Sequence, residues 1–410
     1  MKLTVFPFRN RIRGEIEVPV SKYHLHRALI FGSLAEGTTL IRGRSNCGHI
    51  KDTLHALRDL GIRIDTLADG YRVVGGPYRS SRNRIFVGGC GSTLQFLLGL
   101  GCYSDGPVTY DGNRLLRGRP IGPLLDALSQ VGVRWRSADH CLPVTVLPGL
   151  PNGGAVRIPG TLSQWASGLL MLAPFARHAT SIEITPPFNE RNYIALTLAM
   201  LRQFGIRVQG SLAARRFLVP PRQHYQARTI EIEADISSAA FLLAVAALHP
   251  ADMVLTGIDR ACTHPEGKIL PLLRQMGVPL RFHSRRHAVI VRHNGVALRP
   301  IVADMRTIPD LIPILSVLAA AAPGRSVLRN IAPCRLKECD RVKAMRVQLG
   351  RMGASLEEDG DDLVIHGGRP LTGSAVSSYD DHRVEMALAV AGTIAQGPTH
   401  ITYPRAFRLS

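Results

Sequence analysis

The chain has 410 residues, too many for one ordinary hydrophobic core, so its length predicts two domains. Its composition, 45% hydrophobic and 20% charged, is typical of a folded globular protein and excludes an extended low-complexity chain. The formal net charge of +19 favours anionic partners, whereas an aromatic content of only 6% argues against a nucleic-acid binder that stacks bases.

The sequence gives no sign of a membrane span or a disulfide framework. The longest apolar runs, 239–248 and 311–322, are well short of the roughly 20 residues that cross a bilayer. Residues 1–9 lack the apolar core and cleavage site of a signal peptide, so we expect a cytoplasmic protein. The seven cysteines are scattered without a Cys-x-x-Cys pair, which predicts free thiols and no structural zinc site.

Nearly continuous apolar segments recur along the chain, each shortly after a polar or capping residue. Because such a helix has no polar face, we expect it to be buried on every side. The segments are 28–34, 94–100, 166–172, 239–248, 311–322 and 386–395. Their helices are expected to begin near Lys22, Ser92, Ser163, Ser237, Asp310 and His382.

A second, amphipathic helix alternates with each apolar one and is closed by a glycine, the residue that a left-handed helix C-cap favours. The closing glycines recur about every 70 to 76 residues. They are Gly61, Gly132, Gly205, Gly277 and Gly353. With short strands between the helices, the chain is expected to hold six βαβαββ-type repeats, the last without its amphipathic helix. The N-terminal strands, 3–6 and 14–18, are expected to pair with the last repeat.

The repeats divide naturally into three per domain. We expect domain I to comprise residues 1–19 and 235–410, and domain II to comprise 20–234. Because the apolar helices begin at equivalent ends of their repeats, their N-termini should converge in a cleft between the domains. A helix N-terminus carries about half a positive charge and free N–H groups, so this cleft should bind anions.

Acidic and basic residues cluster on either side of the apolar segment 311–322. The order is Asp-Met-Arg-Thr-Ile-Pro-Asp at 304–310 and Arg-Leu-Lys-Glu-Cys-Asp-Arg at 335–341, followed by Ser-Tyr-Asp-Asp-His-Arg at 378–383. Taken singly, Asp310 could simply start a helix, and Glu338 with Arg341 could be an ordinary i, i+3 pair. Together, the spacing favours a site for anionic substrates.

These clusters resemble the signature of the enolpyruvyl transferase family, in particular its EPSP synthase (3-phosphoshikimate 1-carboxyvinyltransferase) branch. The resemblance covers residues 18–407. It is also carried by Pro-Val-Ser-Lys-Tyr-His-Leu-His-Arg-Ala-Leu at 19–29, Gly-Gly-Cys-Gly-Ser-Thr-Leu-Gln-Phe at 88–96 and Leu-Leu-Arg-Gly-Arg-Pro-Ile-Gly-Pro-Leu at 115–124. It implies an α/β fold, a two-domain inside-out barrel with three repeats per domain and the active site in the inter-domain cleft.

The resemblance also implies the chemistry. The enolpyruvyl group of phosphoenolpyruvate would pass to an acceptor hydroxyl by addition and elimination, with release of phosphate. Lys22, Asp310 and Glu338 stand at the catalytic positions. The residues implied to bind substrates are Lys22, Arg27, Gly91, Ser92, Arg119, Ser163, Gln164, Tyr193, Asp310, Lys337, Arg341, His382, Arg383 and Arg405. No metal or cofactor is implied, and the family suggests a monomer.

The sequence departs from the family pattern mainly on the acceptor side. Tyr23 and Leu162 replace serines, Pro333 replaces an asparagine, and Glu190 stands at a phosphate-binding serine position. Gly89 and Gln95 also differ from the family loop. The phosphoenolpyruvate set is retained apart from Arg405, which replaces a lysine. We therefore expect an enolpyruvyl transferase whose acceptor is no longer shikimate 3-phosphate.

Three alternatives remain open. The chain could be an authentic EPSP synthase that uses shikimate 3-phosphate. A UDP-N-acetylglucosamine enolpyruvyl transferase usually carries a reactive cysteine where this chain has Arg114. A non-catalytic binding protein, or a relative of the RNA 3′-phosphate cyclases on the same scaffold, would explain the positive charge. The retained Lys22, Asp310, Glu338 and Arg341 count against this last alternative.

Overall fold

Helices without a polar face occur at every position where the sequence predicts them. The computed structural model describes residues 2–79 and 84–409, and within these ranges the six helices are α1 (Lys22–Leu34), α3 (Gly91–Leu100), α6 (Ser163–Leu172), α8 (Ile236–Leu248), α10 (Ile312–Ala321) and α12 (His382–Ile394). Every residue of α1 is buried, the predicted apolar segment 28–34 as well as the polar Lys22 and Arg27 of its first two turns. Polar caps start several of these helices: Asp235 accepts a hydrogen bond from the backbone N–H of Ser238, and Ser21 accepts one from that of His24.

The amphipathic helices follow the predicted alternation. They are α2 (Gly48–Asp59), α5 (Gly122–Gln130), α7 (Arg191–Gln203), α9 (Ile269–Gln275) and α11 (Arg341–Arg351). Each is followed by its predicted glycine at positive φ, for example Gly61 at +83° and Gly353 at +90°. The left-handed conformation is open to glycine without steric penalty, which confirms the predicted C-caps. Shorter helical segments are α4 (Arg114–Arg117), η1 (Gly101–Tyr103), η2 (Ala173–Phe175), η3 (Ser284–Arg286), η4 (Met305–Thr307), η5 (Pro309–Leu311), η6 (Ala332–Arg335) and η7 (Ala406–Leu409).

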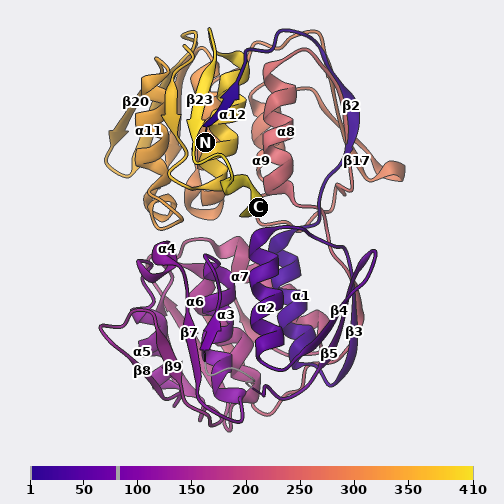
Figure 1. Cartoon of the computed structure of the whole chain (residues 1–410), viewed down its shortest axis with the longest axis vertical. Helices are drawn as coiled ribbons and strands as arrows, with labels where there is room; N and C mark the ends of the chain where they lie inside the picture. The colour runs from indigo at the N-terminus through magenta and orange to yellow at the C-terminus, as the bar shows by residue number, and fades with distance from the viewer. Residues whose placement is uncertain (1, 80–83, 410) are drawn as a thin grey trace. The chain divides into compact units, whose positions relative to one another are not determined.

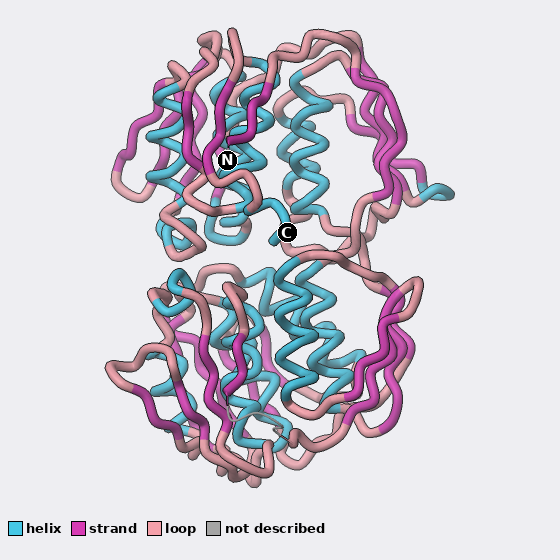
Figure 2. Tube along the Cα trace, in the orientation of Figure 1, coloured by secondary structure: helices cyan, strands magenta, loops and turns pink. Residues whose placement is uncertain are grey.

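The chain forms two compact units, each with its own hydrophobic core. Unit 1 comprises Met1–Pro19 and Glu233–Ser410, and unit 2 comprises Val20–Ile232. In unit 2, helix α3 contacts both α1 and α6, and in unit 1 helices α8, α10 and α12 contact one another. Within each unit the sheets lie outside these helices (Figure 1), with the strands around the helical interior (Figure 2). This is the predicted inside-out α/β barrel.

Each four-stranded sheet has one order: an edge strand parallel to its neighbour, then two antiparallel pairings. In the described part of unit 2 the sheets are β14 (Thr229–Glu231)–β3 (Gly37–Arg42)–β5 (Gly70–Gly75)–β4 (Arg63–Thr66), β6 (Arg84–Phe86)–β7 (Val108–Asp111)–β9 (Val144–Val146)–β8 (Trp135–Ser137) and β10 (Gly154–Pro159)–β11 (Thr180–Thr185)–β13 (Arg216–Val219)–β12 (Gln209–Ser211). In unit 1 they are β2 (Ile12–Glu17)–β15 (Ala251–Thr256)–β17 (Ala288–His293)–β16 (Leu280–His283) and β18 (Val302–Asp304)–β19 (Gly324–Arg329)–β21 (Asp362–Gly367)–β20 (Ser355–Asp359). The recurrence of one order confirms the repeat.

The last repeat is completed by the N-terminus. Strand β22 (Ala375–Ser377) lies parallel to β23 (Thr399–Thr402), and β1 (Lys2–Val5) pairs antiparallel with β23. The expected pairing of strand 3–6 is therefore confirmed, but that of strand 14–18 is wrong, because β2 runs parallel to β15. The reason lies at the chain crossovers: β2 precedes α1 yet joins the sheet after α8, while β14 precedes α8 yet joins β3 after α1. The two repeats exchange edge strands.

The predictions about thiols and membrane spans can also be compared with the structure. All seven cysteines fall within the described ranges and are free thiols, as expected. Of the helices in residues 2–79 and 84–409, none combines the length and the hydrophobicity that spanning a bilayer requires.

Close packing of α3 against α6 depends on Gly168, since a Cβ there would lie 2.3 Å from the carbonyl oxygen of Gln95. We expect Gly168→Ala to lower the free energy of unfolding by about 1–3 kcal/mol, because the helices must separate. Gly350→Ala in α11 is the control, since a Cβ there meets nothing within 4 Å and should stabilise the helix by up to about 1 kcal/mol. Urea denaturation of both variants measures the difference, and equal effects would contradict this packing argument.

Candidate active site

A buried guanidinium organises the acidic and basic residues of unit 1. Arg341, the first residue of α11, is only 1% exposed. Its Nε donates to Asp381 Oδ2 at 2.8 Å, Nη1 to Asp310 Oδ1 at 2.7 Å and Nη2 to Glu338 Oε2 at 2.6 Å. Burial alone lowers the pKa of Arg341, but the facing carboxylates outweigh it and hold the pKa well above the ordinary value. A permanently charged group therefore fixes the carboxylates in place.

Asp310 lies among basic side chains. It belongs to η5, immediately before α10, and is 8% exposed. Besides Arg341, the Nζ of Lys337 lies 3.8 Å from Asp310 Oδ1, and the Nη2 of Arg383 lies 3.4 Å from Oδ2. His382 and Arg383 begin α12 and are each 1% exposed. The structure thus brings together the residues that the sequence placed in unit 1, with the exception of Arg405.

Asp381 was missed by the sequence analysis, although the neighbouring His382 and Arg383 were chosen. It is fully buried, caps α12 by accepting the backbone N–H groups of Arg383 and Val384, and pairs with Arg341. An aspartate directly before an apolar helix is a typical N-cap, so the sequence held a signal for the cap. It held none for the pairing with Arg341, which lies forty residues away along the chain.

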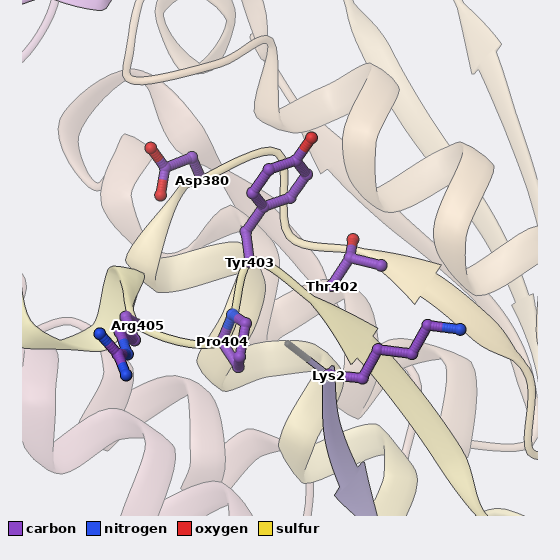
Figure 3. Close-up of a pocket in the computed structure, with 6 residues that line it drawn as sticks. All are labelled: Lys2, Asp380, Thr402, Tyr403, Pro404 and Arg405. Atoms are coloured by element: carbon purple, nitrogen blue, oxygen red, sulfur yellow. The ribbon is translucent and has the colours of Figure 1, made fainter.

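Arg405 lies in a pocket formed by the C-terminal segment. This pocket has a volume of about 740 Å³ and is lined by Lys2, Asp380, Thr402, Tyr403, Pro404 and Arg405 (Figure 3). The carboxylate of Glu385 accepts the backbone N–H of Phe407 at 2.8 Å, which ties the segment to α12. The lining holds two cationic side chains, Lys2 and Arg405, and one carboxylate, Asp380, so cations outnumber anions in it.

In unit 2, the guanidinium of Arg27 donates its hydrogen bonds to groups of the chain itself. It is 2% exposed, and its guanidinium donates to Thr197 Oγ1 at 2.9 Å and to the backbone carbonyls of Tyr23 at 2.9 Å and Tyr193 at 3.2 Å. It also stacks over the ring of Phe96, 4.8 Å from the centroid. Burial lowers the pKa of Arg27 to about 9, so the side chain stays cationic at neutral pH. These contacts fasten α1 to α7 and hold Tyr193 beside Tyr23.

The glycine loop before α3 lies against other predicted site residues. A Cβ on Gly91 would lie 2.5 Å from Nη1 of Arg119, so glycine lets this arginine approach the backbone. Gln164, in the first turn of the neighbouring helix α6, donates from its Nε2 to Ser92 Oγ at the start of α3, at 3.1 Å. Lys22 also belongs to unit 2, 8% exposed, with its Nζ 5.9 Å from the ring centroid of Tyr23. Lys22, Arg119 and Gln164 supply cationic and amide donors of the kind that bind oxyanions.

Ser163, at the start of α6, is bonded to a carboxylate of its own chain. Its backbone N–H and its hydroxyl both donate to Glu190 Oε2, at 2.9 Å and 2.7 Å. Glu190 is only 2% exposed. The donors that the sequence assigned to a substrate therefore hold Glu190 here.

The acidic side chains of unit 1 lie against basic ones. Within residues 2–79 and 84–409, no group of three or more His, Cys, Asp or Glu residues is arranged to hold a metal ion. The carboxylates of unit 1 are engaged by arginine and lysine instead. The arrangement suits proton transfer by carboxylates and binding of anions by cationic side chains.

The glycine loop also predicts a pH effect on stability. Asp52 of α2 lies under the loop, where a Cβ on Gly88 would come within 2.4 Å of its Oδ1. Burial raises the pKa of Asp52 to about 7, although a hydrogen bond from the Gly89 backbone opposes the shift. The pKa of an aspartate in the unfolded chain is about 3.9. Between about pH 4 and pH 7 the folded chain therefore holds a proton on Asp52 that the unfolded chain has lost. The free energy of unfolding consequently falls as pH rises through this range.

We therefore expect Asp52→Asn to be more stable than the wild type at pH 8 and equal to it near pH 3. Thermal unfolding measured across this range checks the expectation. A stability difference that stays constant with pH would contradict the buried, protonated state of Asp52.

Known proteins match this chain over nearly its whole length. The family model for EPSP synthase (3-phosphoshikimate 1-carboxyvinyltransferase) matches residues 8–410. The 3-phosphoshikimate 1-carboxyvinyltransferase of Methanococcus vannielii is 32% identical over 407 residues, which cover 98% of this chain and 94% of that protein. Its counterpart from Methanocorpusculum labreanum is 34% identical over 405 residues, again 98% of this chain and 94% of the relative.

The chain also matches solved structures over nearly its whole length. An EPSP synthase from Acinetobacter baumannii matches with a TM-score of 0.81 at 26% identity, over 99% of this chain and 95% of that chain. The likeness extends over the whole fold and not over one unit alone. The chain belongs to the EPSP synthase family of enolpyruvyl transferases.

Proposed function

We propose that this enzyme transfers the enolpyruvyl group of phosphoenolpyruvate to a hydroxyl of shikimate 3-phosphate, the reaction for which its relatives are named. The observation that carries the proposal is the arrangement of Asp310 and Glu338 on the Arg341 guanidinium. Two carboxylates held side by side by a buried cation provide proton-transfer groups at a fixed place.

The chemistry needs two proton transfers in an addition step and one in an elimination step. In the addition step, the acceptor hydroxyl oxygen bonds to the central carbon of phosphoenolpyruvate, its proton passes to a carboxylate, and the methylene carbon takes a proton from an acid and becomes a methyl group. In the elimination step, this methyl carbon gives a proton back to a base, the carbon–carbon double bond re-forms, the carbon–oxygen bond to phosphate breaks, and phosphate leaves. We assign the carboxylate roles to Asp310 and Glu338 and the cationic acid to Lys22. Such proton transfer commonly contributes about 10²- to 10⁴-fold in rate.

Arg341 has a different proposed role from the one that the sequence implied. Its three guanidinium nitrogens donate to carboxylates of the chain. We therefore propose that Arg341 positions Asp310 and Glu338, while Arg119, Lys337 and Arg383 neutralise substrate anions. Gly91, Ser92 and Gln164 would support the phosphoenolpyruvate side by keeping Arg119 close to the loop.

A second candidate is transfer to another hydroxyl acceptor. It is favoured by one contact, the bond of Ser163 to Glu190, because this carboxylate takes up donors that an acceptor phosphate would use. Leu162 and Pro333 also lack the polar side chains that the family pattern has at these positions, and Tyr23 places a larger phenol where the pattern has a serine. The relatives' names favour the first candidate, and this contact favours the second.

Phosphate release from phosphoenolpyruvate, with and without shikimate 3-phosphate, separates the candidates. The first candidate predicts release that depends on shikimate 3-phosphate. Calorimetric titration with phosphoenolpyruvate accompanies the assay. Binding of phosphoenolpyruvate without release would contradict the first candidate and favour the second, and absence of binding would contradict both.

The carboxylate roles predict how variants behave. Asp310→Asn and Glu338→Gln should each lower kcat by about 10²- to 10⁴-fold, because the amides cannot accept the proton. Glu357→Gln is the matched control, since this carboxylate lies on β20 with its side chain 67% exposed and should leave kcat unchanged. Steady-state phosphate release measures all three. A kcat within about threefold of the wild type for both site variants would overturn the assignment.

A further inference from the structure

Helix α4 is too short to hold its own position. It comprises the four residues Arg114–Arg117, of which Leu116 alone is buried. A single helical turn gains too few backbone hydrogen bonds to be stable by itself, so contacts with the rest of unit 2 must fix it. Its position matters because Arg119 follows two residues later and donates its backbone N–H to the Leu116 carbonyl at 3.1 Å.

An aspartate at the end of β7 holds α4 by an ion pair. Asp111 is only 2% exposed. Its Oδ1 accepts the Nε of Arg117 at 2.9 Å, and its Oδ2 accepts the Nη2 at 2.6 Å. Two parallel bonds between a guanidinium and a carboxylate fix orientation as well as distance. The last residue of α4 is therefore tied to the last residue of β7.

The Asp111 carboxylate keeps its charge at neutral pH. Burial alone raises its pKa, but the hydrogen bonds from Arg117, from Arg84 and from the Gly112 backbone outweigh burial and lower the pKa to about 2. Arg84 lies on β6, and its Nη2 donates to Asp111 Oδ2. Because β6 already pairs with β7 through the backbone, this second bond joins two neighbouring strands. Of the two arginines, Arg117 alone belongs to α4.

Beyond α4, Arg119 lies against the glycine loop. A Cβ on Gly91 would come within 2.5 Å of Arg119 Nη1, so this guanidinium is placed against the loop backbone. The loop is also bonded to the start of α4, since Asn113 donates its backbone N–H to the Gly88 carbonyl at 2.8 Å. Movement of α4 away from β7 would carry Arg119 away from the loop.

We propose that Asp111 and Arg117 are positioning residues for the reaction: their ion pair fixes α4, and α4 holds Arg119 where it neutralises the anionic groups of phosphoenolpyruvate. The inference rests on the proposed function and adds to it the pair that places one of its cationic side chains. Asp111 and Arg117 act through Arg119 and not on the substrate. Loss of the pair therefore weakens the binding of phosphoenolpyruvate and leaves the proposed proton-transfer groups unchanged.

The test compares Arg117→Ala with Arg84→Ala. Each variant removes one arginine from Asp111, and the two side chains are similarly exposed, 48% for Arg117 and 57% for Arg84. We expect Arg117→Ala to raise the KM for phosphoenolpyruvate at least about tenfold with kcat within about threefold of the wild type. Arg84→Ala should leave both constants within about twofold. Equal changes in the two variants would overturn the proposal, because the hold on α4 would then not be the cause.

Two further variants follow the route through Arg119. Lysine keeps the positive charge but lacks the fork that makes two parallel bonds, so Arg117→Lys should have a KM between those of the wild type and Arg117→Ala. In an Arg119→Ala background, Arg117→Ala should weaken the binding of phosphoenolpyruvate by less than about threefold more. If the two losses of affinity multiply in full, the pair does not act through Arg119 and the proposal is overturned.

Calorimetry with phosphoenolpyruvate on the same full-length samples separates this inference from the proposed function. If no sample releases phosphate in the presence of shikimate 3-phosphate, the proposed transfer is contradicted, whereas the Kd values for phosphoenolpyruvate still decide the role of the pair. A Kd in Arg117→Ala equal to that of the wild type overturns the inference even when phosphate is released. If Arg117→Ala does not fold, Arg117→Lys takes its place, and a Kd unchanged from the wild type again overturns the inference.

Discussion

The arrangement of unit 1 depends on the buried charge of Arg341. A guanidinium that is 1% exposed needs partners for its charge and its donors, and it finds them in Asp310, Glu338 and Asp381. These carboxylates come from segments that are far apart in sequence: η5 before α10, the loop before α11 and the cap of α12. Because one planar group bonds to them all, the starts of α10, α11 and α12 are fixed relative to one another. The carboxylates proposed to transfer protons therefore lie at helix starts of unit 1.

In unit 2 the buried groups that need partners are hydrogen-bond donors at a helix start and on an arginine. Here the helix starts supply donors, and the chain itself provides the acceptors: Glu190 for Ser163, and the Thr197 hydroxyl with backbone carbonyls for Arg27. In unit 1, by contrast, the two carboxylates proposed to transfer protons, Asp310 and Glu338, are held by the donors of Arg341.

Much of the fold could be predicted from the sequence because its signals are local. Apolar runs marked the buried helices, and the regularly spaced glycines marked the ends of the amphipathic helices. The pairing of β2 with β15 could not be predicted, because the chain exchanges edge strands at its crossovers and no local pattern records such an exchange. The site shows the same limit. Asp310, Glu338 and Arg341 stood out by motif, but the pairing of Asp381 with Arg341 and of Glu190 with Ser163 depends on tertiary contacts.

A double-mutant cycle between Arg341 and Asp381 tests most directly whether this buried ion pair organises the site. Unfolding free energies are measured for the wild type, Arg341→Met, Asp381→Asn and the double variant. Arg341→Met leaves the buried Asp381 carboxylate without its cation, and Asp381→Asn removes one of the three carboxylates on Arg341, so we predict a coupling free energy of about 2 kcal/mol or more between the two positions. If the changes in unfolding free energy of the two single variants add to that of the double variant within about 0.5 kcal/mol, the account is contradicted, because the contact between Arg341 and Asp381 would then contribute no coupling.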